Sequence, residues 1–191
     1  MNHPQPTETS KEPLAPGQRL PESECKELSP EAIAEIHAIM AKYPDKLAAT
    51  LPALYIAQRE FGFVSLSAMK AVARAIGIPE GHVFGVATFY TMYQKAPVGK
   101  FHFSVCTNIS CALRGAAQLL EKVCERTGVK PGEGPSPDGL WSVEEVECLA
   151  GCGVAPCIQV NHDVYDELVD EDKLVEVMEA CKRGDYRPWA E

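Results

Sequence analysis

Apolar residues recur at helical spacing through the first half of the chain, beginning near Ser29. A serine hydroxyl can cap free N–H groups, and Pro30 suits the first position of a helix. Ile33, Ile36 and Met40 then follow at the spacing of one helix face. Similar patterns predict helices over about 46–60, 65–77 and 79–93, with glycines after the first two of these. Four short helices with short connections predict a small antiparallel bundle over residues 29–97.

The pattern turns to alternation after Pro97. FHFSV (101–105) reads as a strand and is followed by an amphipathic helix over about 111–126. Three more strands are expected in 141–148, 157–161 and 164–168, and a last helix begins near Asp170. The order β-α-β-β-β-α is that of a compact thioredoxin-like α/β domain over 98–184. The predicted fold class is therefore α+β, with an N-terminal antiparallel helical bundle followed by this domain.

The two ends of the chain lack such patterns. Residues 1–28 are rich in proline and poor in large apolar side chains, which predicts a disordered tail, and Cys25 in it is expected to be a bystander. Residues 185–191 are taken as a C-terminal tail. No apolar run approaches the length of a membrane span, and the N-terminus resembles neither a signal peptide nor a transit peptide. We therefore expect a cytoplasmic chain with no direct membrane insertion.

Charge and cysteine content narrow the possible functions. The net charge of -9 makes nucleic acid an unfavourable partner. Eight cysteines in a chain from a reducing compartment indicate metal binding or catalysis more than disulfides.

Four cysteines form two close pairs at predicted strand ends, Cys106-x4-Cys111 and Cys148-x3-Cys152. Adjacent strand ends can bring both pairs to one edge of a small sheet, where four thiolates suit a structural zinc or an iron–sulfur cluster. Spacing alone leaves both open. The glycines beside Cys152, which free backbone N–H groups to turn inward, and the helix start at Cys111 favour iron–sulfur.

Several stretches carry a resemblance to a known family. CTNISC, ECLAGCGVAPCIQVN, VYDEL and GVATFYTMYQKAPVGK are similar to the small [2Fe-2S] subunit, a thioredoxin-like ferredoxin, of the NADH dehydrogenase module of respiratory complex I. The resemblance covers about residues 29–183. Related subunits occur in NAD-linked hydrogenases and formate dehydrogenases, which remain alternatives.

This resemblance implies a site and partners. The cofactor ligands, and hence the metal ligands, would be Cys106, Cys111, Cys148 and Cys152, holding one [2Fe-2S] cluster. The main partner would be a flavin subunit that binds NADH and holds FMN and a [4Fe-4S] cluster, alongside further peripheral-arm subunits at the cytoplasmic face of the inner membrane. The chain would relay electrons in NADH:quinone oxidoreductase. It lacks a G-x-G-x-x-G nucleotide motif, so no NADH site and no catalytic residue are expected on it.

Other residues have plainer interpretations. Cys157, Cys124 and Cys181 are expected to pack in the core. Phe89, Tyr90 and Tyr93 are candidates for a partner contact, with core packing as the alternative, and neither His102 nor His162 is assigned a role. Glu144, Glu145 and Glu147 read as a solvated strand face, with the further hypothesis that Glu145 and Glu147 together lower the potential of the cluster.

Three rival classes remain open. They are a zinc-stabilised binding module, a thiol–disulfide oxidoreductase, which the absence of C-x-x-C disfavours, and a free-standing ferredoxin, which the predicted helical bundle disfavours.

Overall fold

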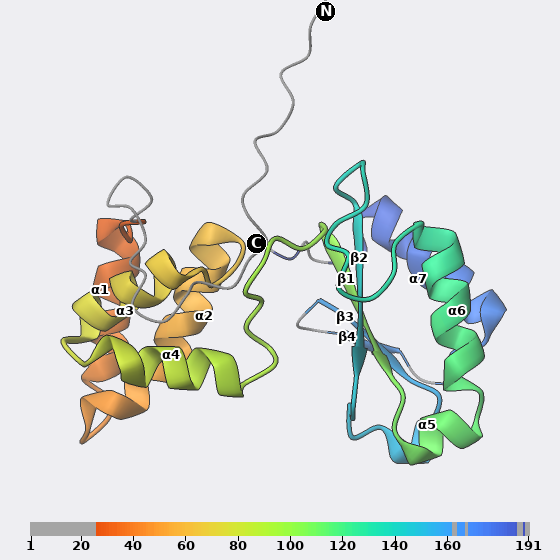
Figure 1. Ribbon diagram of the computed structural model, residues 1–191, viewed down its shortest axis with the longest axis horizontal. Helices are drawn as coiled ribbons and strands as arrows, with labels where there is room; N and C mark the ends of the chain where they lie inside the picture. The colour runs from red at the N-terminus through yellow and green to blue at the C-terminus, as the bar shows by residue number, and fades with distance from the viewer. Residues whose placement is uncertain (1–25, 162–163, 167, 187–188, 190–191) are drawn as a thin grey trace, which may run out of the picture.

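A computed structural model describes residues 26–161, 164–166, 168–186 and 189 (Figure 1). Cys25, His162 and most of the predicted N-terminal tail lie outside the described residues. Helices occupy the first part of the described chain, and a small sheet with flanking helices occupies the second. The predicted mixed fold is confirmed.

The N-terminal helical region begins where its sequence signal predicts, at Pro30. The elements are α1 (Pro30–Met40), the 3-10 helix η2 (Lys46–Ala49), α2 (Thr50–Phe61), α3 (Leu66–Ile76) and α4 (Glu80–Phe89). Ser29 caps α1 by accepting from the Ala32 N–H, and Ser65 caps α3 by accepting from the Ala68 N–H. Gly77 ends α3 in the left-handed conformation, at φ 73°. The four α-helices share one apolar core, in which Ile36, Leu54 and Val72 are fully buried.

Helix α4 is shorter than predicted. It ends at Phe89, and Tyr90 is already extended at φ -88°, ψ 120°. Tyr93 instead folds back into the helical core, where its hydroxyl donates to the Leu51 carbonyl at 2.9 Å. The chain from Tyr90 to Lys100 then crosses to the sheet.

The second part holds a four-stranded sheet in the order β2-β1-β3-β4. Its elements are β1 (Phe101–Cys106), α5 (Ile109–Leu113), α6 (Ala116–Thr127), β2 (Trp141–Val146), the 3-10 helix η3 (Cys152–Val154), β3 (Ile158–Val160), β4 (Val164–Asp166) and α7 (Glu171–Arg183). Strand β1 pairs parallel with β2 and antiparallel with β3. The helix predicted over 111–126 is two helices, because Gly115 turns the chain at φ 93° between α5 and α6.

The two faces of the sheet have different neighbours. Phe101, Phe103 and Val105 pack with α6 and α7 in a second apolar core. His102 and Ser104 alternate with them on β1, so they lie on the opposite face, where His102 contacts the side chain of Gln94 in the segment that follows α4. The sheet therefore stands between two helical layers, as Figure 1 shows edge-on.

Trp189, within the segment predicted as a tail, lies at the boundary of the two parts. Its ring is buried, and its Nε1 donates to the Gly62 carbonyl of the helical region at 2.8 Å. Its backbone N–H donates to the Lys100 carbonyl at 2.9 Å, just before β1. No helix among the described residues combines the length and apolarity needed to cross a membrane.

Candidate functional site

Three cysteine sulfurs meet at one end of the sheet. Cys106 is the last residue of β1, Cys111 lies in α5, and Cys157 directly precedes β3. Their Sγ atoms all lie within 4.8 Å of one another, and all three residues are buried. The backbone joins two of them, since the Cys106 N–H donates to the Cys157 carbonyl at 3.3 Å. Two of the predicted ligands are thus brought together, in company with a third thiol that was not predicted as a ligand.

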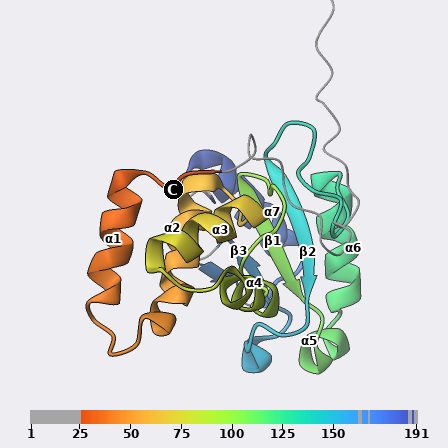
Figure 2. The ribbon, with the colours of Figure 1, turned by 60° about the vertical axis from the view of Figure 1, so that its left-hand side comes forward.

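Cys148 and Cys152 lie on the loop after β2 and are exposed. They do not join the three-sulfur group, but their loop borders it. The Leu149 N–H faces the Cys106 sulfur, and η3, which starts at Cys152, contacts α5. Figure 2 shows this loop beside α5. The assignment of all four cysteines as ligands therefore stays a prediction, with one pair buried and the other on an adjoining loop.

Cys157 is buried, as expected, but its surroundings are those of the site. Only 1% of its surface is exposed, and it packs with Cys106, Cys111 and Ala155 in a small cluster separate from the two main cores. Cys124 and Cys181, by contrast, pack against the α6–α7 core, as predicted.

Peptide N–H groups and burial set the electrostatics of the site. Burial pushes the pKa of Cys106 up, but hydrogen bonds from the N–H groups of Asn108 and Leu149 and from the neighbouring thiols bring it below its ordinary value. Burial raises the pKa of Cys111 and, with the adjacent sulfurs, raises the pKa of Cys157 to about 12. The pocket thus stabilises negative charge on the sulfur of Cys106 in particular.

A family model described as thioredoxin-like [2Fe-2S] ferredoxin matches residues 36–182. The chain belongs to this family. The ferredoxin assignment decides between zinc and iron–sulfur in favour of one [2Fe-2S] cluster. The donor set fits that group, because soft thiolates are the ligands of such clusters and inward N–H groups stabilise their negative charge.

Curated relatives of this ferredoxin are named as subunits of NADH-quinone oxidoreductases. NADH-quinone oxidoreductase subunit 2 of Thermus thermophilus is 42% identical over 146 residues, which cover 75% of this chain and 80% of that protein. Another NADH-quinone oxidoreductase subunit, from Rhizobium meliloti, is 39% identical over 151 residues, covering 78% of this chain and 89% of that protein. Among solved structures, a chain of an NAD+-reducing [NiFe]-hydrogenase in the air-oxidised state aligns with a TM-score of 0.59 at 20% identity, over 71% of this ferredoxin and 23% of that longer chain. The last likeness shows the fold alone.

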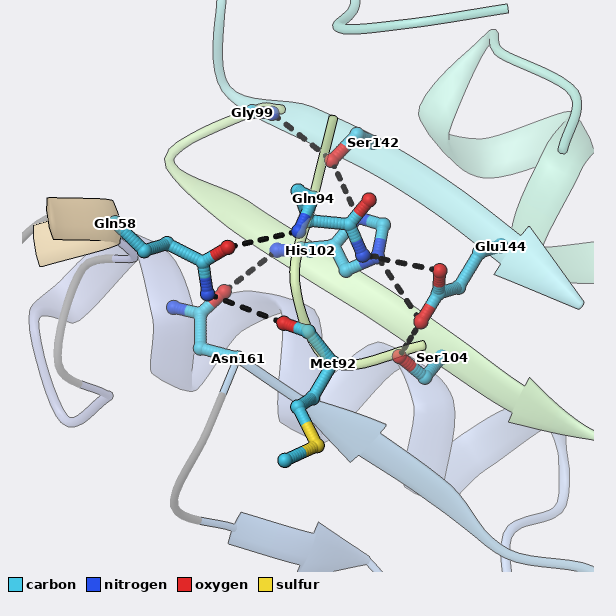
Figure 3. A network of polar contacts seen from close by, with 9 residues as sticks. All are labelled: Gln58, Met92, Gln94, Gly99, His102, Ser104, Ser142, Glu144 and Asn161. Atoms are coloured by element: carbon cyan, nitrogen blue, oxygen red, sulfur yellow. Dashed lines mark hydrogen bonds and ion pairs between the residues drawn. The ribbon is translucent and has the colours of Figure 1, made fainter. Parts of the chain in front are cut away.

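A partly buried polar network between the two parts of the ferredoxin was not predicted (Figure 3). Gln94 lies at its centre. The Gln94 N–H donates to the Gln58 side chain of α2 at 2.7 Å, and its own side-chain amide donates to Glu144 at 3.1 Å. His102 lies against the same amide at 3.3 Å.

The network continues along the two central strands. His102 Nδ1 lies 2.7 Å from the Ser142 hydroxyl, and its Nε2 lies 3.3 Å from Glu144. Ser104 donates to Glu144 at 2.7 Å. The sequence did contain a signal for this network, the alternation of polar residues on β1 and β2. It puts His102, Ser104, Ser142 and Glu144 on one face of the sheet, and polar side chains on a covered face need hydrogen-bond partners.

The aromatic candidates for a partner contact divide into two groups. Tyr93 is a core residue with no exposed surface, so its place is the helical core and not a contact with a partner. Phe89 remains 77% exposed at the end of α4, and Tyr90 is also exposed. Beside the cysteines, Ile109 and Leu113 of α5 are exposed as well.

Proposed function

We propose that this chain is the electron-transfer subunit of an NADH:quinone oxidoreductase. The observation that carries the proposal is the 42% identity to a NADH-quinone oxidoreductase subunit along 80% of that relative's length. The [2Fe-2S] family assignment agrees with a one-electron role.

In this proposal Cys106, Cys111, Cys148 and Cys152 hold the cluster as thiolates. When bound, the cluster supplies a site that accepts and returns single electrons. The N–H groups of Asn108 and Leu149 donate to the Cys106 sulfur and offset its negative charge. Burial of Cys106 and Cys111 excludes water from one side of the site, while Cys148 and Cys152 form its outer side.

The proposed partner is the flavin subunit that binds NADH and carries FMN and a [4Fe-4S] cluster. Hydride chemistry then belongs to that subunit, and this chain exchanges electrons with its flavin. Exposed apolar side chains at Ile109 and Leu113, beside Cys111, give a partner a surface to cover close to the site. Through this partner and further peripheral-arm subunits, the chain would sit at the cytoplasmic face of the inner membrane.

The second candidate is the equivalent subunit of an NAD-linked hydrogenase or formate dehydrogenase. The shared fold with the NAD+-reducing hydrogenase agrees with it, but at 20% identity that likeness says nothing about the reaction. The much higher identity to the oxidoreductase subunits favours the first proposal.

Two experiments test the proposal. Electron paramagnetic resonance of the purified chain should show a rhombic signal only after dithionite reduction, and a chain without iron would overturn it. Membranes from a strain lacking the chain should lose NADH:quinone activity and regain it on complementation. Loss of hydrogen- or formate-dependent NAD+ reduction, with NADH:quinone activity intact, would replace the first candidate with the second.

A further inference from the structure

The sulfur of Cys157 lies in contact with the sulfurs of the proposed ligands. It is 3.8 Å from the Cys111 sulfur, within hydrogen-bonding distance for two sulfur atoms. It also lies within 4.8 Å of the Cys106 sulfur. Cys157 is therefore in contact with the buried pair of proposed ligands.

The loop that carries the exposed pair encloses the same sulfur from another side. A Cβ atom placed on Gly151 would lie 2.9 Å from the Cys157 sulfur, which is closer than real Cβ contacts. The backbone of the loop between Cys148 and Cys152 therefore packs directly on Cys157. This explains the glycine at 151 and fixes the thiol between the loop and Cys111.

A thiol that does not ligate a metal can donate a weak hydrogen bond through its S–H group. A thiolate that ligates iron can only accept. Donors to the sulfurs of an iron–sulfur cluster are among the features that set its potential, and they favour the reduced state because it carries the greater negative charge.

We propose that Cys157 is a positioning residue whose S–H donates to the Cys111 sulfur and so raises the potential of the cluster. The inference rests on the proposed function, in which Cys111 is a ligand and Cys157 is not.

The test compares three substitutions in the full-length chain carrying its cluster. Cys157→Val keeps an apolar side chain of similar size without a donor, Cys157→Ala removes donor and volume, and Cys157→Ser keeps a donor. Cys181→Ala, at a thiol equally buried in α7, is the matched control. Iron and acid-labile sulfide contents are measured first, and then the midpoint potential is measured by titration followed by electron paramagnetic resonance.

All four variants are expected to keep the iron and sulfide content of the wild-type chain. The Val and Ala variants should have lower midpoints by similar amounts, up to a roughly tenfold shift in the reduction equilibrium, or about 59 mV for one electron. The Ser variant should stay nearer the wild-type value, and Cys181→Ala should match it. A donor role, unlike a packing role, predicts that Val and Ala behave alike and that Ser rescues.

Unchanged midpoints in both the Val and Ala variants would overturn the donor role. Loss of iron from Cys157→Ala, with iron retained in Cys148→Ala, would show that Cys157 is a ligand and overturn it in another way. A wild-type chain that takes up no [2Fe-2S] cluster would overturn the proposed function itself, so the two failures are distinguishable.

Discussion

Gln94 and Glu144 are 50 residues apart in sequence and 3.1 Å apart in space, the Gln94 side-chain amide donating to the Glu144 carboxylate. This contact links the segment after α4 to β2, the strand that leads to Cys148. Glu144 also accepts from Ser104 and lies beside His102. The helical region is thereby tied to the two strands whose ends carry the cysteines.

The first prediction concerns stability and pH. Although burial pushes the pKa of Glu144 up, hydrogen bonds from His102, Ser104 and Gln94 hold it below its ordinary value. A lowered folded-state pKa contributes stability above the unfolded pKa, near 4.3, and this contribution disappears as pH falls through the folded value. Glu144→Gln should therefore lower the free energy of unfolding by about 1–3 kcal/mol at pH 7. Urea unfolding followed by circular dichroism measures this.

The difference between the Glu144→Gln variant and the wild type should shrink below about pH 4.3, where the wild-type carboxylate takes up its proton. Glu145→Gln is the matched control, because Glu145 is the exposed neighbour on the same strand. It should stay within about 0.5 kcal/mol of the wild type. A Glu144→Gln effect that persists unchanged at low pH would argue against the charge as its source.

A second prediction concerns the ligands. Cys148→Ala and Cys152→Ala should each lose or degrade the cluster, seen as reduced iron content and bleached visible absorption, because each removes one of four thiolates. Cys124→Ala, whose thiol packs against the α6–α7 core, is the control and should remain coloured. Full iron content in either ligand variant would remove that cysteine from the proposed set.

The acidic residues before Cys148 give a third prediction, which the structure sharpens. Glu144 pairs with Ser104 in register, and alternation along β1 and β2 puts it on the same sheet face as Cys106. Glu145 lies on the opposite face of the sheet. Both Glu145 and Glu147 are exposed, so solvent and salt screen their charges. Removing the Glu144 charge should therefore raise the midpoint potential more than the double change Glu145→Gln, Glu147→Gln. Redox titrations in the same buffer compare them; a larger rise in the double variant would restore the original hypothesis.

Gly99 gives a fourth prediction. A Cβ there would lie 2.7 Å from the backbone carbonyl oxygen of Trp141, closer than real Cβ contacts, and the Gly99 N–H donates to the Ser142 hydroxyl at 2.9 Å. Gly99→Ala should lower stability by about 1–3 kcal/mol, since the backbone of β2 must move.

Gly85→Ala is the control for Gly99. None of the residues that the structure describes would come within 4 Å of a Cβ at Gly85, inside α4. This change should be neutral or stabilising by up to about 1 kcal/mol, because alanine is the better helix former. Thermal unfolding of the two variants distinguishes a steric clash with β2 at position 99 from a general effect of replacing glycine. Equal transition temperatures would contradict the clash.

Local signals predicted most of the secondary structure. Ser29, Ser65 and Asp170 cap helices because their side-chain oxygens accept from backbone N–H groups within three residues. The end of α4 could not be read this way. The helical pattern continues through Tyr93, but that ring packs against Tyr55 of α2, with centroids 5.2 Å apart, and such a contact has no local signature.

The site shows the same limit. Spacing identified the two cysteine pairs, since ligand pairs are local. The place of Cys157 depends on the antiparallel pairing of β1 with β3, which sets Val105 opposite Ile158 and brings the residue that precedes β3 beside Cys106. The polar network likewise joins Gln58, Gln94 and Glu144 across intervals of 36 and 50 residues. Pairings of that range come from the tertiary fold.

Trp189 links the two parts of the chain, because it donates hydrogen bonds to the carbonyls of Gly62 in the helical region and Lys100 just before β1. Its ring also packs in a T-shaped arrangement with His102, with centroids 5.4 Å apart. A miniature ferredoxin excised at residue 98 would keep this indole and the His102–Glu144 pair but lose the groups that satisfy and cover them. One face of its sheet would then expose polar side chains that have lost some of their hydrogen-bond partners. The helical region and the sheet region of this chain should accordingly be kept together as one unit when they are expressed or exchanged between related proteins.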